Sequence, residues 1–137
     1  KSISVKFIDE LRKKFPKIQL QAISSNFILN GSHLKKILSL SLESEKNNLL
    51  LSKKLETDIL MRFALTTQIS NAITVVGIKP KSNFILIAIG NKKILQSLYD
   101  EMILKSMILF QKNNNSFLKN ILRLQKNNLM LFTLKLL

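Results

Sequence analysis

Six consecutive apolar residues, Phe84–Ile89, place the strongest constraint on how this chain can fold. The run has the length of a β-strand and falls far short of the roughly 20 apolar residues that a membrane-spanning helix needs. Because it is apolar on both faces, it predicts a central strand that is buried in a sheet. Gly90 and Asn91 then turn the chain into a predicted helix over residues 92–110.

Hydrophobic spacing predicts the other elements. Strict alternation over residues 18–22 indicates a half-buried strand. Apolar residues at helical spacing predict helices over residues 7–15, 33–45, 52–65, 68–76 and 116–126. We expect the helix over residues 68–76 to end at Gly77, in the left-handed conformation that glycine tolerates after a helix. The apolar tail over residues 129–137 is compatible with a strand or with a helix.

The fold class that follows is α+β. We expect two or three strands in a small mixed or antiparallel sheet, packed with five or six helices, in a single domain that spans residues 1–137. A hydrophobic content of 46% supplies enough side chains for a real core, which excludes a disordered segment. The first residue is Lys, so we expect the natural chain to start before it. No basic, hydrophobic leader opens the chain, and we expect a cytoplasmic location.

The residue types argue against an enzyme. The chain has no Cys and one His, so it lacks thiolate ligands and thiol nucleophiles and holds too few ligands for a zinc site. It contains none of the glycine motifs of phosphate-binding loops, dinucleotide folds or nucleophile elbows. Adjacent carboxylates such as Asp9 and Glu10 lie on polar helix faces among lysines, which is typical of a solvated surface. We therefore expect a binding module without catalytic residues, metal, cofactor or small-molecule substrate.

The formal charge of +14 has two interpretations. A small domain with this charge attracts polyanions, of which nucleic acid is the usual one. However, the composition also has the bias of an AT-rich genome, because AT-rich codons encode the abundant residues: 19 Lys, 13 Asn and 17 Ile, against 3 Arg. Such a bias would place lysines on a solvated surface without any partner. Arginine is the residue that binds phosphate in a planar, bidentate way, and it is scarce here.

Residues 18–90 contain an ordered series that resembles a known family. IQLQAI is followed by NGSHL, then by KKLETDILMRFALTTQISNAITVVGIKP, and then by the apolar strand. This order is similar to the PRPK-binding-protein (TPRKB) family, the small accessory subunit of the KEOPS complex of archaea and eukaryotes. The residues that match in order are Gly31, His33, Leu34, Asp58, Leu60, Gln68, Ile69, Ala72, Ile73, Gly77, Ile78 and Lys79.

The resemblance implies a non-catalytic protein with two partners. KEOPS makes the threonylcarbamoyl modification (t6A) on the adenosine next to the anticodon of tRNAs that read codons starting with A, and a separate subunit performs that chemistry. The accessory subunit binds the small kinase-like ATPase subunit, and in archaea it also binds the single-stranded 3′ CCA end of tRNA. An apolar helical surface is expected at the contact with the kinase-like subunit. Exposed Leu and Ile residues on the helices after residue 91 are candidates for it, but burial in the core explains most of them.

The family motif places the nucleic-acid contacts around the start of the helix over residues 68–76. Backbone amides at that start would bind a phosphate, and the side-chain amide of Gln68 would offer both a donor and an acceptor. Ile69 would pack against a terminal base, and Lys79 would neutralise a phosphate. Thr67, where the family pattern has Arg, and His33 complete the predicted set.

Other interpretations stay open at this point. His33 would be structural, and Ile69, Ala72 and Ile73 would belong to the core. A purely structural adaptor would bind the kinase-like subunit without tRNA. The positions of five lysines distinguish the adaptor from a tRNA-binding subunit. Tight clustering on one surface near Gln68 would favour tRNA binding, and dispersal would favour the adaptor; the lysines are Lys35, Lys36, Lys79, Lys92 and Lys93. Peripheral membrane binding would require an exposed apolar tail over residues 129–137.

Overall fold

Strand β2 (Phe84–Ile89) lies inside a four-stranded antiparallel sheet, as its apolar sequence predicts. The sheet has the order β1-β2-β4-β3, in which β1 is Gln19–Ser24, β3 is Leu118–Leu124 and β4 is Leu129–Leu134. The computed structural model describes residues 3–79, 83–109, 118–124 and 129–134.

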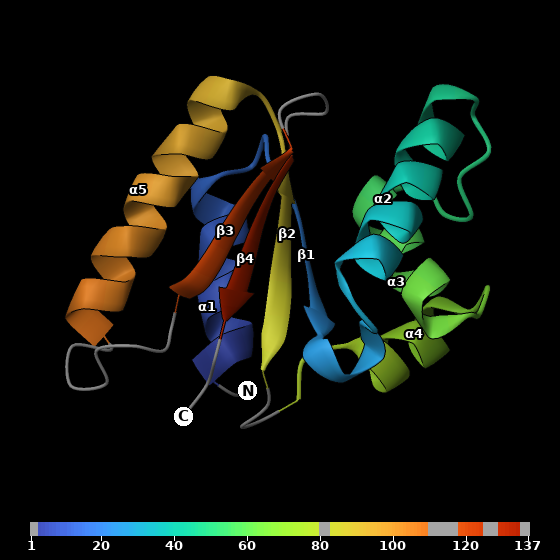
Figure 1. Ribbon diagram of the computed structural model, residues 1–137, viewed down its shortest axis with the longest axis horizontal. Helices are drawn as coiled ribbons and strands as arrows, with labels where there is room; N and C mark the ends of the chain where they lie inside the picture. Colours follow the sequence, from blue (N-terminus) through green and yellow to red (C-terminus); the bar gives the residue numbers. More distant parts are fainter. Residues whose placement is uncertain (1–2, 80–82, 110–117, 125–128, 135–137) are drawn as a thin grey trace.

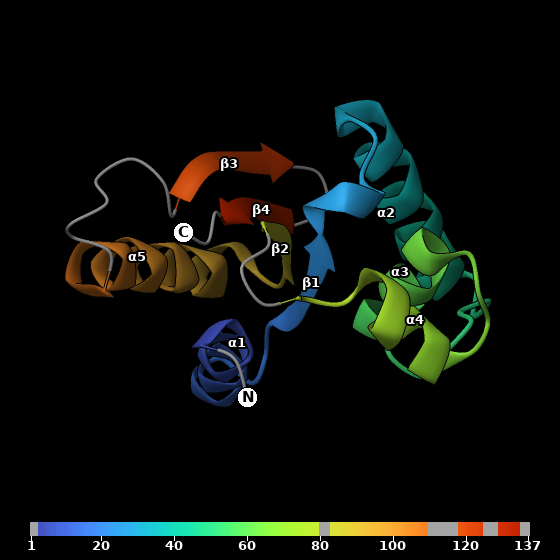
Figure 2. The same ribbon diagram turned by 90° about the horizontal axis from the view of Figure 1, so that it is seen from below.

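Helices cover both faces of this sheet (Figure 1 and Figure 2). Helices α1 (Ile3–Lys14) and α5 (Lys92–Leu109) lie on one side. Helices α2 (Gly31–Lys46), α3 (Leu55–Ala64) and α4 (Ile69–Val76) lie on the other. A short 3₁₀ turn, Ser25–Phe27, follows β1 directly and leads the chain toward α2.

The period of two along β2 divides the core into two halves. Phe84, Leu86 and Ala88 pack with α1 and α5, whereas Ile87 and Ile89 pack with α2, α3 and α4. Successive side chains of a strand point to opposite faces, so only an uninterrupted apolar run can fill both halves. All five side chains are at most 8% exposed. One strand therefore holds two layers of helices together.

The structure confirms the α+β class and most of the predicted elements. Both predicted strands are present, as are the predicted helices over residues 33–45, 52–65, 68–76 and 92–110, with ends that shift by a few residues in the described part of the chain. Asn30 caps α2, since its side chain accepts a hydrogen bond from the His33 N–H at 2.9 Å. The first helix starts at Ile3 rather than near residue 7.

The predicted helix over residues 116–126 is wrong where the structure describes it, because Leu118–Leu124 is strand β3. β3 pairs with β4, and the opposite edge of β4 pairs with β2. Without β3, the outer edge of β4 would present unpaired backbone donors and acceptors. The pairing satisfies these groups, so tertiary context overrides the helical spacing of the segment. The sheet accordingly has four strands rather than two or three.

The apolar tail is an internal strand over residues 129–134. Leu131 is 4% exposed and packs in the core half that α2, α3 and α4 cover. The peripheral-membrane interpretation required an exposed tail, and at this residue the structure contradicts it. Residues 135–137 lie outside the described part of the chain.

The described helices give no simple membrane span. None of them is by itself long and apolar enough to cross a membrane. Helices α3 and α4 reach the required length and hydropathy only when they are taken together, and the two are bent by 66° relative to each other. The apolar side chains of α3 are those of a core helix, with Leu55, Ile59 and Met61 all at most 1% exposed.

Gly77 ends α4 in a way that differs from the prediction. Its φ of −65° and ψ of 168° are extended rather than left-handed. Glycine is needed here for space, because a Cβ would lie 2.3 Å from the carbonyl oxygen of Ile73. The left-handed conformation occurs instead at Leu65, with a φ of 57°, where α3 ends.

We expect Gly77→Ala to destabilise the protein by about 1–3 kcal/mol, the usual cost of forcing extra atoms into a packed site. Gly31→Ala is the matched control, because a Cβ at Gly31 meets nothing within 4 Å. Alanine is favoured over glycine in helices by about 0.5–1 kcal/mol, so this variant should be neutral or slightly stabilised. Urea unfolding measures both, and equal stabilities for the two variants would contradict the steric account of Gly77.

Candidate nucleic-acid interface

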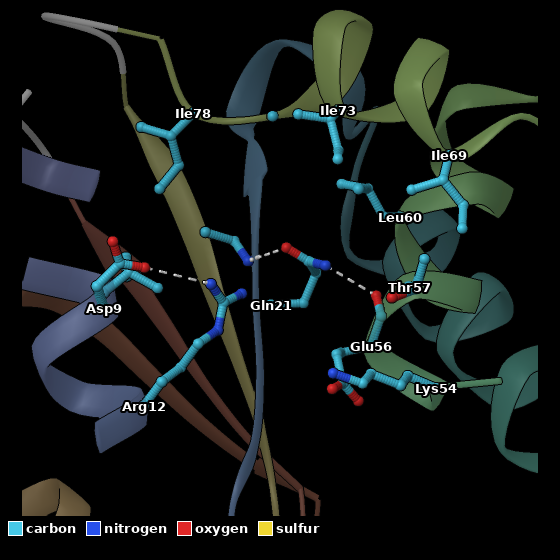
Figure 3. Close-up of a pocket in the computed structure, with 13 residues that line it drawn as sticks. Asp9, Arg12, Gln21, Lys54, Glu56, Thr57, Leu60, Ile69, Ile73 and Ile78 are labelled. Atoms are coloured by element: carbon cyan, nitrogen blue, oxygen red, sulfur yellow. Dashed lines mark hydrogen bonds and ion pairs between the residues drawn. The ribbon is translucent and has the colours of Figure 1, made fainter. Parts of the chain in front are cut away.

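A groove of about 470 Å³ follows the outer edge of β1 between two helical walls (Figure 3). One wall is α1, and the other is formed by α3 and α4. β1 is the terminal strand of the sheet, so this edge has no strand partner among the described strands. The volume falls within the roughly 300–1,000 Å³ of small-ligand sites.

Gln21 closes the floor of the groove. Its Oε1 accepts a hydrogen bond from the Ala22 N–H at 3.0 Å, and its Nε2 donates to the backbone carbonyl of Glu56 at 2.9 Å. A single side-chain amide thus satisfies a backbone donor of the edge strand and ties β1 to the first turn of α3. Its polar side chain faces the groove rather than bulk solvent.

Charged side chains of both signs line the two walls. On α1, Arg12 Nη2 donates to the Leu20 carbonyl at 3.1 Å, and Nη1 lies 3.8 Å from Asp9 Oδ1. The Arg12 side chain is 45% exposed, so water screens this ion pair and its energy is small. Lys54 and Glu56 line the opposite wall at the start of α3.

Helix α4 contributes an apolar surface to the groove. Ile69 and Ile73, one turn apart, are 47% and 57% exposed, whereas Ala72 and Val76 on the inner face are 0% exposed. The interpretation that Ile69, Ala72 and Ile73 are all core is therefore right only for Ala72. Two large aliphatic side chains in water form a surface onto which an aromatic base or an apolar side chain can pack.

Only Ile69 of the five predicted contact residues lines this groove. Gln68 is exposed at the N-cap of α4, where its side chain does not cap the helix but accepts a hydrogen bond from Asn71 Nδ2 at 2.6 Å. Lys79 Nζ donates to the Thr74 carbonyl near the end of α4, a common way to satisfy the last carbonyls of a helix.

The remaining two predicted residues lie elsewhere. His33 Nδ1 accepts a hydrogen bond from the Leu29 N–H at 3.2 Å, and its ring meets Phe63 edge-on at 5.5 Å between centroids. These contacts support the structural interpretation of His33. Thr67 lines a second hollow.

That second hollow lies between α2 and the end of α3 and is mostly apolar. Leu40, Leu51 and Leu65, which line it together with Arg62, are 43%, 44% and 91% exposed. We call it the leucine hollow, defined by these three leucines. Several exposed leucines in one concave region are typical of a protein-binding surface.

Asp58 supports the leucine hollow from inside. Its carboxylate is 0% exposed and accepts hydrogen bonds from Arg62 Nε and from the Leu51 N–H, both at 2.8 Å. Arg62 Nη2 also donates to Ser44 Oγ at 3.0 Å. Through these contacts Asp58 joins α3 to the segment before it and to α2.

The same contacts set the pKa of Asp58. Burial raises the pKa, but the hydrogen bonds from Arg62 and Leu51 outweigh this effect and hold the pKa below its ordinary value of 3.8.

The lysines considered above do not gather on one surface. Lys35 and Lys36 belong to α2, whereas Lys92 and Lys93 begin α5 on the opposite side of the sheet (Figure 2). Lys79 follows α4. In the part of the chain that the structure describes, no three His, Cys, Asp or Glu side chains could hold a metal ion together.

Sequence reasoning missed most of the groove. Arg12 is one of only 3 Arg in a lysine-rich chain, which could have marked it as a residue with specific contacts. Gln21 belongs to the glutamine-containing strand of the family resemblance, a second usable signal. Lys54 carries no signal, because nothing in the sequence separates it from 18 other lysines.

Comparison with known families gives one clear result. The model of the family described as kinase binding protein CGI-121 matches residues 3–129, which includes nearly all of the chain. No match is found among the curated proteins.

We expect Asp58→Asn to destabilise the protein by about 3–5 kcal/mol, since it leaves the Arg62 guanidinium without its buried partner. Asp100→Asn on α5 is the matched control, because Asp100 is exposed and should change stability by no more than about 0.5 kcal/mol. Thermal unfolding of the two variants measures the difference.

The same carboxylate makes stability depend on pH. Because the pKa of Asp58 is lower in the folded protein, its contribution is complete above the unfolded value near 3.8 and is lost as pH falls through the folded value. Below that range the wild type and Asp58→Asn should converge in stability. A constant gap between them down to the lowest pH would contradict the assignment.

Proposed function

The chain belongs to the CGI-121 family of kinase-binding proteins, and we propose that it is a non-catalytic, cytoplasmic accessory subunit of KEOPS. In this role it binds the small kinase-like ATPase subunit and recruits tRNA by the 3′ CCA end for t6A modification. The family match over residues 3–129 is the observation that carries the kinase-binding part of the proposal. The tRNA part rests on the resemblance in the sequence and on the surfaces described above. The chemistry belongs to another subunit, so this chain needs no cofactor and no small-molecule substrate.

The groove along β1 suits a single-stranded RNA end. Proteins read such ends by packing splayed bases on side chains and by hydrogen bonds to the base edges. Ile69 and Ile73 offer the packing surface. Beside it, the Gln21 amide has a second N–H and a second oxygen lone pair besides those that bind Glu56 and Ala22. Arg12 and Lys54 supply cations on the two walls for phosphates.

The segment between α3 and α4 leads to Ile69, which lines the groove, and it also supports the proposal of tRNA binding. Gln68 is exposed there and leaves the first amides of α4 without a side-chain cap. Such amides favour an anion at the helix start. Thr67 replaces the family's Arg in this segment and removes a charged donor, so the remaining contacts carry a larger share of the binding.

The leucine hollow suits the kinase-like subunit better than α5 does. The helices after residue 91 were candidates for this contact, but Leu95, Leu98 and Met102 of α5 are at most 2% exposed and belong to the core, which is the alternative that the sequence left open for them. Leu40, Leu51 and Leu65 are exposed on the opposite layer. Burial of large apolar side chains at the centre of an interface is the usual source of affinity between proteins.

A second candidate is the structural adaptor that binds the kinase-like subunit without tRNA. The dispersal of Lys35, Lys36, Lys92 and Lys93 over both helical layers favours it. So does Thr67 in place of Arg. An adaptor would show only the salt-sensitive, sequence-independent RNA binding that any chain with a charge of +14 has.

The first test compares binding of intact tRNA and of the same tRNA without its CCA end across a salt series. We expect at least about tenfold weaker binding of the shortened tRNA at each salt concentration, because the base and ribose contacts of the end are lost. Equal and steeply salt-dependent binding of both RNAs would reject recruitment by the 3′ end and leave the adaptor.

Substitutions on α4 locate the contact. Ile69→Thr and Ile73→Thr remove apolar surface from the groove and should weaken binding of intact tRNA about three- to tenfold, in line with the loss of one or two methyl-sized groups. Val75→Thr is the control, since Val75 is 41% exposed on the same helix and does not line the groove. If Val75→Thr weakens binding as much, the loss does not come from the groove.

The kinase contact has its own test. The double substitution Leu40→Ser/Leu65→Ser should weaken binding of the kinase-like subunit by about tenfold or more, as truncation of central apolar residues does. Leu29→Ser is the control, because Leu29 is 83% exposed and does not line the hollow. Titration calorimetry with the purified kinase-like subunit measures both, and unchanged affinity of the double variant would place the kinase contact elsewhere.

A further inference from the structure

Leu65 differs from the other leucines of the leucine hollow, because its backbone has a conformation that leucine avoids. With φ 57° and ψ 41°, it lies in the left-handed region where α3 ends. Crowding between the Cβ and the following carbonyl oxygen raises the free energy of this conformation, and only glycine is free of that crowding. Among the described residues, one other non-glycine residue has a positive φ, Asn48, and asparagine tolerates that region.

The fold gains little from the leucine side chain at this position. Leu65 is 91% exposed, the highest exposed fraction among the large apolar side chains that the structure describes. A left-handed residue at the end of a helix is usually glycine, and an apolar contact back onto the last turn often accompanies it. A side chain this exposed makes little contact of that kind, so glycine would end α3 with less strain. A strained residue that the fold does not need indicates a role in function.

The turn around Leu65 is held by hydrogen bonds that follow it. The Thr66 N–H donates to the Met61 carbonyl at 3.2 Å, and the Gln68 N–H donates to Thr66 Oγ1 at 3.1 Å. The leucine side chain is therefore presented from a fixed backbone. A side chain that is already in place loses less conformational entropy when a partner binds.

The chemistry of the hollow favours a protein partner over a nucleic acid. Among the described residues that line it, Arg62 is the only charged one, and its guanidinium is paired with the buried carboxylate of Asp58 at 2.8 Å. A phosphate would have to compete with that carboxylate. A protruding Leu65 beside Leu40 and Leu51 instead complements an apolar pocket on a protein, since burial of such side chains from water is favourable.

We propose that Leu65 is the residue that anchors the kinase-like subunit at the leucine hollow, with its side chain seated in an apolar pocket of that subunit. The proposal rests on the proposed function, since it assumes that the hollow is the kinase contact. It adds the residue that determines the affinity. It also gives a reason for leucine where glycine would be more stable: the side chain lowers the stability of the free protein and raises the affinity of the complex.

Three substitutions at Leu65 separate the side chain from the backbone strain. Leu65→Gly removes both, so the unfolding equilibrium constant should fall about two- to tenfold, while the affinity for the kinase-like subunit falls at least about tenfold. Leu65→Ala removes most of the side chain but keeps the Cβ, so it should lose the same affinity without the gain in stability. Leu65→Met keeps a long apolar side chain and should bind within about threefold of the wild type.

Leu29→Gly is the matched control. Leu29 is 83% exposed, does not line the hollow and is not among the residues at positive φ. Glycine at this position should lower the stability, because it gives the unfolded chain more freedom, and should leave the affinity unchanged. Urea unfolding of the full chain measures the stability, and titration calorimetry with the purified kinase-like subunit measures the affinity.

The outcomes separate this proposal from the proposed function. If Leu40→Ser weakens binding but Leu65→Gly and Leu65→Ala bind as the wild type does, the hollow remains the kinase contact and Leu65 is not its anchor. If the wild type does not bind the kinase-like subunit, both proposals are overturned. A Leu65→Gly variant that is less stable than the wild type would overturn the strain and give Leu65 a structural role. Loss of tRNA binding in Leu65→Ala, with kinase binding intact, would overturn the choice of a protein partner.

Discussion

Burial of β2 on both faces is the constraint on which the rest of the structure depends. Each of its side chains must be removed from water on one side or the other, so helices have to cover both faces of the sheet. This arrangement leaves β1 as an edge strand between the two helical layers. The groove forms where α1 from one layer and α3 and α4 from the other flank that edge.

The two arginines whose side chains are described show why the Lys/Arg ratio of this chain is informative. Arg12 contacts a backbone carbonyl of β1 and lies near Asp9, and Arg62 contacts Asp58 and Ser44. Each makes two contacts in different directions, which a planar guanidinium allows and a lysine ammonium on its flexible stem matches poorly. In a chain with 19 Lys, an arginine therefore marks a position with specific geometry, here beside the groove and beside the leucine hollow.

The two exposed surfaces differ in chemistry, which is why they suit different partners. The groove combines aliphatic side chains with an amide and with charges of both signs, a mixture that matches the parts of a nucleotide. The leucine hollow is mostly apolar, and the one arginine that lines it is already paired with Asp58. Because Asp58 binds the Leu51 backbone and Arg62 reaches Ser44, the hollow has a rigid support, and a preorganised surface loses less entropy when a protein partner binds.

Local pattern was sufficient for much of the fold, and long-range contacts decided the rest. The apolar run Phe84–Ile89 predicted a buried strand and amphipathic spacing predicted most helices, because both signals lie within a few residues. The pairing that turned Leu118–Leu124 into a strand comes from β4, so helical spacing there was misleading. Similarly, the sequence alone indicated a basic, non-catalytic binding module and the family motif around Gln68 and Ile69. Only the tertiary structure brought Arg12, Gln21 and Lys54 to the side of Ile69, because they come from segments that meet only when both helical layers pack on the sheet.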